Sequence, residues 1–339
     1  MEKTKQKQIT DFLINNGVII VMFILVIVAG VTTQNFFTLN NLTNLLNNMS
    51  FRLVIALGIA GCIVLTGTDL SAGRVVGLTA CISASLLQSM DYATKMFPNL
   101  QPLPIPVVIL IVVVVGGIVG FVNGWFVAQF KLHPFIVTLA TQLITYGVLL
   151  LYIMINGNNG QPLSGLDNSF KNFVTGSLVK FFGVPIPNYV WYAIIMIAFM
   201  WFMWNKTTFG KNMFAVGSNP EAANVSGVSV FWTTIAVHTL AGCMYGITGF
   251  IESARIGSNQ ANTGLNYECD AIAACVIGGV SFVGGTGKIS GIVLGVFILR
   301  IIFVALQFLS INQSMQYIIK GLIILVACSI DMRKYLVRK

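Results

Sequence analysis

The chain has 339 residues, of which 56% are hydrophobic and only 9% are charged, whereas an ordinary globular domain is about 25% charged. So few charges cannot cover the surface of a water-soluble fold. The net charge of +9 is spread over connections and both termini, without a basic stripe interleaved with aromatic residues, so a nucleic-acid partner is not indicated. Composition therefore predicts an all-α polytopic integral membrane protein surrounded by lipid.

A membrane-crossing helix needs about 20 mostly apolar residues. The segments that meet or approach this length are residues 12–31, 51–67, 71–89, 106–130, 135–155, 189–204, 232–252, 270–284, 289–309 and 314–331. The third and eighth are short and interrupted by glycine, which is typical of broken or re-entrant helices. The pattern predicts about ten helices in one transmembrane domain that spans residues 1–339.

The first apolar segment follows Lys3, Lys5 and Lys7 and lacks a small-residue cleavage site. We therefore interpret it as a retained helix rather than a signal peptide. Assigning Arg74 to an inner connection, and Arg52 and Arg255 to outer ones, leaves more Lys and Arg residues inside than outside. This bias predicts an even number of crossings with both termini cytoplasmic.

Pairs of glycines recur four residues apart in three predicted spans. They are Gly120 and Gly124, Gly242 and Gly246, and Gly291 and Gly295. Such spacing lets helix backbones approach closely in lipid. We interpret these glycines as packing surfaces rather than ligand sites.

Catalytic motifs are missing from the sequence. A phosphate-binding loop requires Gly-Lys followed by Ser or Thr, but Gly210-Lys211 is followed by Asn212 and Gly287-Lys288 by Ile289. No nucleophile–base arrangement and no His or Cys spacing for a metal is visible. The chain is thus predicted to have no catalytic, metal or cofactor site and no ATPase activity of its own.

The inner connection, residues 205–231, contains the strongest local signals. Asn219 is a good N-cap, Pro220 suits the first helical position, and Glu221 complements the positive helix end. Gly227 is a natural helix stop. The sequence therefore predicts a capped helix of about two turns, which is either a connector or a rigid element that fits a partner.

Several polar residues fall in or beside the predicted spans. Burying a charge near the bilayer centre costs about 3 kcal/mol on insertion scales, so such residues usually face a cavity or a partner. Asp69 is expected to cap the helix that starts near Ser71, which we favour over substrate contact. Lys320 is expected to snorkel outward. Arg300 is expected to face the bundle interior and to pair with Asp270.

Glu221-Ala222-Ala223 followed by Gly227 resembles the EAA signature of ABC importer permeases. Residues 66–74 (Thr-Gly-Thr-Asp-Leu-Ser-Ala-Gly-Arg) and 267–274 (Tyr-Glu-Cys-Asp-Ala-Ile-Ala-Ala) resemble the two blocks of the ribose/xylose-type sugar permeases. Asn123-Gly124 and residues 316–321 also fit this family. The resemblance covers residues 50–330, and within the family it is strongest to the galactose/methyl-galactoside permeases. Cys269 and Arg300 depart from the family pattern.

The resemblance implies an ABC importer permease in the bacterial cytoplasmic membrane. A homodimer of the chain would work with an ATP-binding subunit, which carries ATP and Mg²⁺, and with an extracytoplasmic sugar-binding protein. Coupling to the ATPase would fall to Asn219, Pro220, Glu221, Ala222, Ala223 and Gly227. Asp69, Asn123, Asp270, Arg300 and Lys320 would line the pathway or support the membrane structure. The substrate would be galactose or methyl galactoside, with glucose as another possibility.

A second interpretation is an ion-coupled secondary carrier for a small polar solute. Such carriers place carboxylates or broken-helix ion sites near the midplane, as Asp69 and the two short spans allow. The capped helix at 219–227 argues against this class, because a solitary carrier has no ATPase to engage.

Overall fold

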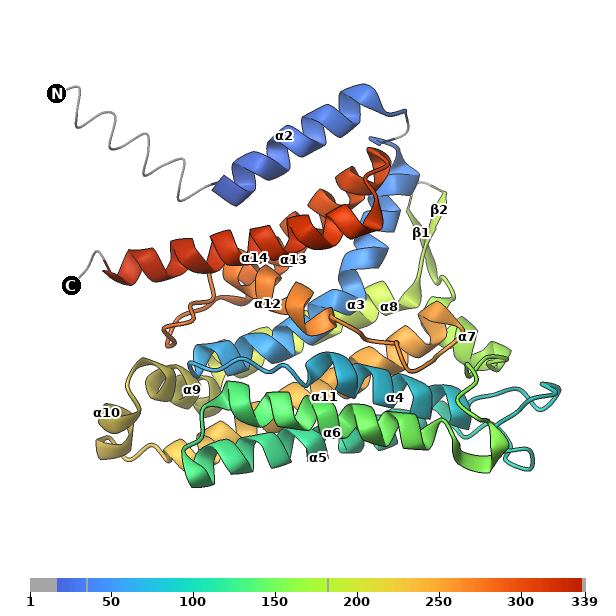
Figure 1. Ribbon diagram of the computed structural model, residues 1–339, viewed down its shortest axis with the longest axis horizontal. Helices are drawn as coiled ribbons and strands as arrows, with labels where there is room; N and C mark the ends of the chain where they lie inside the picture. The colour runs from blue at the N-terminus through green and yellow to red at the C-terminus, as the bar shows by residue number, and fades with distance from the viewer. Residues whose placement is uncertain (1–16, 35, 182, 337–339) are drawn as a thin grey trace.

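The structure is a computed structural model and describes residues 17–34, 36–181 and 183–336. In chain order the elements are α2 (Gly17–Thr32), α3 (Leu39–Val64), α4 (Ala72–Leu86), α5 (Ile105–Phe130), α6 (Pro134–Tyr152), η1 (Ile155–Gly157), α7 (Asn168–Thr175), β1 (Val179–Phe181), β2 (Val184–Ile186), α8 (Asn188–Lys206), α9 (Thr208–Ser218), α10 (Pro220–Val225), α11 (Val230–Ile256), α12 (Tyr267–Ile277), α13 (Ile289–Phe308) and α14 (Gln313–Leu336). The long helices run roughly side by side (Figure 1).

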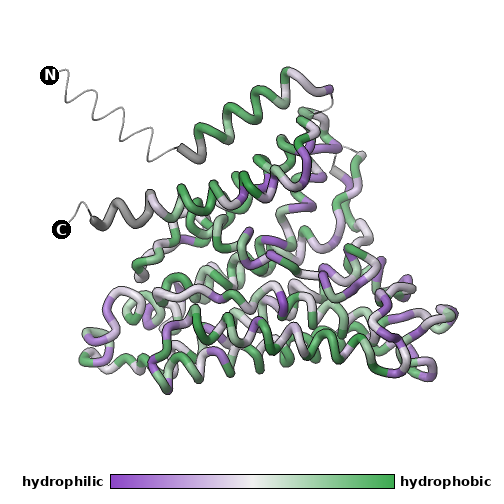
Figure 2. The backbone as a smooth tube through the Cα atoms, in the orientation of Figure 1, coloured by the Kyte–Doolittle hydropathy of each residue, from purple (hydrophilic) through white to green (hydrophobic). Residues whose placement is uncertain are grey.

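Every predicted span coincides with a helix, and the all-α membrane fold is confirmed. Within the described residues, α3, α5, α6, α11 and α13 are long and apolar enough to cross a membrane by length and composition. Green apolar stretches extend along most of the bundle, whereas purple polar stretches concentrate toward its ends (Figure 2). Residues 12–16 of the first predicted span lie outside the described residues.

The two spans predicted to be short are half-length helices. α4 has 15 residues and α12 has 11, so they rise only about 22 Å and 16 Å, against a hydrocarbon core of about 30 Å. Each follows a non-helical segment, residues 65–71 before α4 and 257–266 before α12, and both helices begin in the middle of the bundle (Figure 1).

Extended backbone inside a membrane must be hydrogen-bonded within the protein. Thr138 of α6 serves the first segment: its hydroxyl accepts from Leu70 N at 3.2 Å and donates to Thr68 O at 3.2 Å. The second segment pairs Asn259 with Leu163 through two backbone bonds, and Ala261 O accepts from Arg74 at 3.1 Å. These bonds allow non-helical chain at this depth.

α11 is the central helix and packs most extensively against α5, and also against α4 and α3. The predicted glycine surfaces lie at this contact: a side chain at Gly242 would meet the backbone of Gly116, and one at Gly246 would meet Val112. Gly291 and Gly295 of α13 similarly contact α12. The packing role predicted for these glycines is confirmed.

The two ends of the bundle differ. One end carries α9, α10 and the 281–287 turn, and the opposite end carries α7, the antiparallel β1–β2 hairpin and residues 88–104 (Figure 1). α9 and the hairpin have no counterpart in the predicted spans. α3 begins at Leu39, twelve residues before the predicted start, because its first turns are rich in asparagine and give no apolar signal.

Candidate functional site

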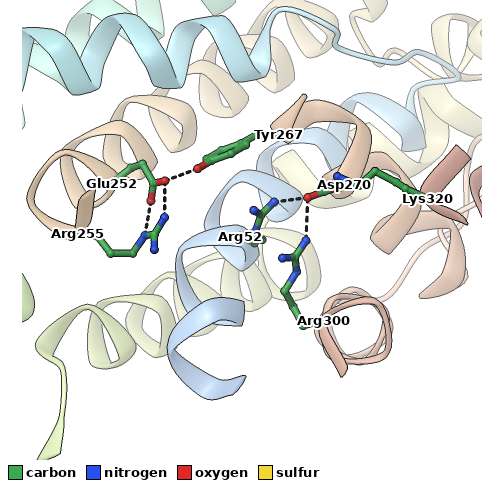
Figure 3. A network of polar contacts seen from close by, with 7 residues as sticks. All are labelled: Arg52, Glu252, Arg255, Tyr267, Asp270, Arg300 and Lys320. Carbon is green, nitrogen blue, oxygen red and sulfur yellow. Dashed lines mark hydrogen bonds and ion pairs between the residues drawn. The ribbon is translucent and has the colours of Figure 1, made fainter. Parts of the chain in front are cut away.

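A charged cluster lies inside the bundle where α3, α12, α13 and α14 meet; it consists of Arg52, Asp270, Arg300 and Lys320 (Figure 3). Asp270 Oδ2 accepts from Arg300 at 2.8 Å and also from Arg52. Lys320 Nζ lies 2.5 Å from Asp270 Oδ1. One carboxylate, 6% exposed, therefore joins three cations that come from three different helices. Because both oxygens have a cationic partner, the carboxylate is stabilised in its charged form.

The position of Asp270 follows from its local sequence. It lies in the first turn of α12 together with Glu268, and acidic residues are favoured at the positive end of a helix. Since α12 begins in the middle of the bundle, Asp270 is delivered to that depth, where Arg300 and Lys320 meet it from full-length helices. The predicted Arg300–Asp270 pair is present.

A second ion pair adjoins the charged cluster. Arg255 donates to both oxygens of Glu252, at 2.6 and 2.7 Å, and Tyr267 donates its hydroxyl to the same carboxylate. Glu252 is fully buried. The guanidinium of Arg52 lies 4.7 Å from the centre of the Tyr267 ring, so contacts run continuously from α11 to the charged cluster (Figure 3).

Asp69 and Asn123 belong to a separate buried network. Asp69 Oδ1 accepts from the backbone N of Ser71 at 2.9 Å and from its hydroxyl at 2.6 Å. The amide of Asn123 donates to the same hydroxyl at 3.0 Å. Asp69 therefore holds Ser71, the N-cap residue of α4, but the predicted side-chain cap on an N–H of the helix itself is not formed. Both Asp69 and Asn123 are fully buried. This geometry describes a structural support rather than a surface that solute reaches.

The capped helix predicted after residue 219 is α10. Asn219 Oδ1 accepts from the backbone N of Glu221 and of Ala222, each at 3.0 Å. Gly227 has φ +84°, the left-handed conformation that favours glycine at a helix stop. Ala223 is buried at 4%, whereas Val225 is 89% exposed. α10 thus displays its remaining side chains at one end of the bundle.

Three expectations from the sequence about cations are wrong. Arg74 does not lie in an inner connection, since it is in the first turn of α4 and donates to Ala261 O. Lys320 does not snorkel outward, because Asp270 lies within ion-pair distance and holds it inside the bundle. Arg52 does not lie in an outer connection, since it is in the middle of α3 and binds Asp270. The misplacement of Arg52 has one cause: the start of α3 is rich in asparagine, so residue 52 looked like the edge of a span.

The pair Glu252 and Arg255, with Tyr267 as its partner, is not among the expectations from the sequence. Glu252 and Arg255 are three residues apart in α11, a spacing at which helical side chains meet. This spacing was the one signal that could have predicted the pair. No group of His, Cys, Asp and Glu that could hold a metal ion occurs among residues 17–34, 36–181 and 183–336.

The chain belongs to the family described as branched-chain amino acid transport system / permease component, which it matches over residues 41–328. It is thus a permease subunit of a transporter, and the resemblance to binding-protein-dependent permeases is confirmed.

The relatives match along 93–100% of the chain. The galactose/methyl galactoside import permease protein MglC of Escherichia coli (strain K12) is 45% identical over 339 residues, which is 100% of both chains. MglC of Haemophilus influenzae is 44% identical over 342 residues, covering 100% of this chain and 99% of that one. The ribose import permease protein RbsC of Escherichia coli (strain K12) is 33% identical over 317 residues, 93% of each. No solved structure matches the chain.

Proposed function

We propose that this chain is the membrane subunit of an ATP-driven importer for galactose or methyl galactoside. The 45% identity to a galactose/methyl galactoside import permease over the full length of both chains supports the substrate class. The observation that carries the coupling assignment is α10, a capped and exposed helix of six residues with one buried side chain, Ala223. The energy comes from ATP hydrolysis by a separate ATP-binding subunit, which docks on α10.

The proposed orientation places α10 in the cytoplasm. Lys206 and Lys211 approach this end, and Lys288 follows the adjacent turn, as the positive-inside rule requires. The start of α2 and the end of α14 lie at the same end (Figure 1), so both termini are cytoplasmic. The opposite end, with α7 and the β hairpin, then faces the extracytoplasmic sugar-binding protein.

In the proposed cycle, the binding protein delivers sugar to the outer end of a homodimer of this chain. ATP binding closes the paired ATP-binding subunits, which carry α10 with them. The helix bundles then change the side from which the pathway is open. ATP and Mg²⁺ are bound by the partner subunit, and coupling falls to Asn219, Pro220, Glu221, Ala222, Ala223 and Gly227. The substrate is selected mainly by the binding protein.

The substrate is tested by reconstitution of the chain with its ATP-binding subunit and sugar-binding protein in proteoliposomes. We expect uptake of labelled galactose that methyl galactoside competes strongly, glucose less, and ribose or xylose weakly. Competition by ribose at a concentration equal to that of galactose would contradict the galactose assignment and leave the importer assignment in place.

The two short helices keep an ion-coupled carrier as the second candidate. Half-length helices that begin in the middle of a bundle are the devices by which such carriers hold ions, and Asp69 lies at one of these starts. That candidate predicts solute uptake by this chain alone, driven by an ion gradient. The same vesicles, prepared without the partner proteins, test it directly.

A further inference from the structure

A polar pocket of about 170 Å³ opens beside the charged cluster. Arg52, Asp270, Arg300 and Lys320 form one side of it, and uncharged polar side chains complete it, namely Gln307, Gln313, Gln316 and Tyr317. Polar groups at this depth usually face a water-filled cavity and mark a solute pathway. The pocket is therefore a candidate for contact with solute, distinct from the coupling surface at α10.

The position of the pocket suits a solute that enters from the side opposite α10. α13 starts at Ile289 near the α10 end, because Gly285 in the preceding turn contacts Ser218 at the end of α9. Gln307 lies at the other end of α13, and Gln313 begins α14. The pocket thus extends from the depth of Arg300 to the end that faces the binding protein in the proposed orientation.

The pocket contains both hydrogen-bond donors and hydrogen-bond acceptors. Asp270 binds all three cations and holds them in place, and the net charge of +2 that remains is shared among three side chains. Gln316 donates its amide to Ile311 O at 2.9 Å, which leaves its carbonyl oxygen as an acceptor. Amides and a phenol add further groups that both donate and accept.

A solute that binds here must both donate and accept hydrogen bonds. A small anion only accepts, so it leaves the carbonyl oxygen of Gln316 unmatched. A polyhydroxylated neutral molecule offers both functions at each hydroxyl group. Unmatched buried polar groups are costly, so the lining favours the neutral solute.

We propose that this pocket is a sugar-contact site within the permease, where Gln307, Gln316 and the exposed donors of the charged cluster bind the hydroxyl groups of the passing monosaccharide. The inference rests on the proposed function and adds a binding site to it. Affinity at this site is low, because a solute in transit must also leave. The charged cluster serves as the fixed wall of the site, since its ions are held by one another.

The test uses Gln307→Leu and Gln316→Leu in the complete complex with both partners, with Gln161→Leu as a matched control. The charged residues are left intact because their removal threatens folding. Gln307 and Gln161 are exposed, so both substitutions are compatible with the fold; Gln161 lies in the 157–167 connection, away from the pocket. Galactose uptake and ATP hydrolysis are measured in the same proteoliposomes, and sugar imported per ATP is compared.

Loss of one hydrogen bond worth about 1 kcal/mol lowers a rate or an equilibrium constant roughly fivefold. We expect sugar imported per ATP to fall about fivefold in Gln307→Leu or Gln316→Leu, and not in Gln161→Leu. If both pocket variants import as much sugar per ATP as the wild type, the proposed role of the pocket is overturned. Absence of ATP-driven uptake in the unsubstituted complex would overturn the proposed function instead. Inhibition of galactose uptake by added sulfate, with wild-type ratios in both pocket variants, would assign the pocket to an anion and also overturn the proposal.

Discussion

Gly217 packs directly against the backbone carbonyl of Val64. A methyl group at Gly217 would collide with Val64 O, and that oxygen accepts a hydrogen bond of 2.9 Å from Gly285 N. Gly217 lies two residues before the N-cap of α10, and Val64 is the last residue of α3. The base of α10 is thus joined to the end of α3 and to the turn before α13, without a flexible link between them.

Under the proposed function, this contact gives a route from the ATP-binding subunit to the pathway. The residue after Val64 begins the extended segment that leads to Asp69 and α4, and Gly285 lies in the turn between α12 and α13. A displacement of α10 therefore acts on the connections of both half-length helices. Because packed interfaces change between discrete arrangements rather than deform continuously, this small contact is suited to coupling.

Gly217→Ala is expected to impair coupling. The added methyl must displace the end of α3 or the 284–285 turn, since the atoms it meets are backbone. Overpacking of this kind costs about 1–3 kcal/mol, and we expect ATP-driven uptake to fall more than ATP hydrolysis. Gly147→Ala is the control, because no atom lies within 4 Å of a side chain there. Equal uptake in the two variants would show that the contact carries no coupling.

Asn219→Ala should weaken α10 without unfolding the bundle. Its side chain accepts from two backbone N–H groups, and loss of such a cap costs about 1 kcal/mol. We expect weaker binding of the ATP-binding subunit, measured by co-purification, with an unchanged melting temperature of the chain. Asn219→Asp retains the cap and should restore binding. Failure of Asp to restore it would mean that the amide contacts the partner directly.

Glu221→Lys should leave membrane insertion intact and uncouple transport from ATP hydrolysis. Glu221 is exposed on α10 and lies in its first turn, so the substitution places a positive charge at the positive helix end and reverses the charge offered to a partner. The measurement is uptake and ATP hydrolysis in the same vesicles, with Glu221→Gln as the milder control. Unchanged association and uptake in Glu221→Lys would contradict a coupling role for this residue.

Asp270→Asn should destabilise the protein more than Arg300→Gln. The first substitution leaves three cations inside the bundle without their carboxylate, whereas the second leaves Asp270 with Arg52 and Lys320. Breaking a buried ion pair costs about 3–5 kcal/mol when a charge is left uncompensated. Thermal unfolding in detergent measures which variant is less stable. A lower melting temperature for Arg300→Gln than for Asp270→Asn would contradict the prediction.

The sequence predicted the features that depend on neighbouring residues. The order of the spans followed from apolar length, and the two short helices followed from their glycines. The cap at Asn219 and the stop at Gly227 followed from residue preferences at helix ends. The Arg300–Asp270 pair was predicted for a different reason: Arg300 was too costly to leave alone in the membrane, and Asp270 was the nearest acidic candidate in the chain.

The features that were missed depend on contacts between distant segments. Arg52 and Asp270 are 218 residues apart, and no local pattern indicates that one carboxylate serves three cations. The predicted outward direction of the Lys320 side chain is wrong for the same reason, since snorkelling is expected only when no counter-ion is within reach. α9 was missed because its eleven residues are too short and polar to register as a span.

Reconstitution of ATP-driven transport tests the central claim most directly. Galactose uptake is measured in proteoliposomes that contain this chain, with the sugar-binding protein outside and no ion gradient, with and without the ATP-binding subunit and internal ATP. The account predicts uptake only when subunit and ATP are both present. Uptake by the chain alone under an imposed ion gradient, unaffected by ATP, would contradict it and establish a secondary carrier.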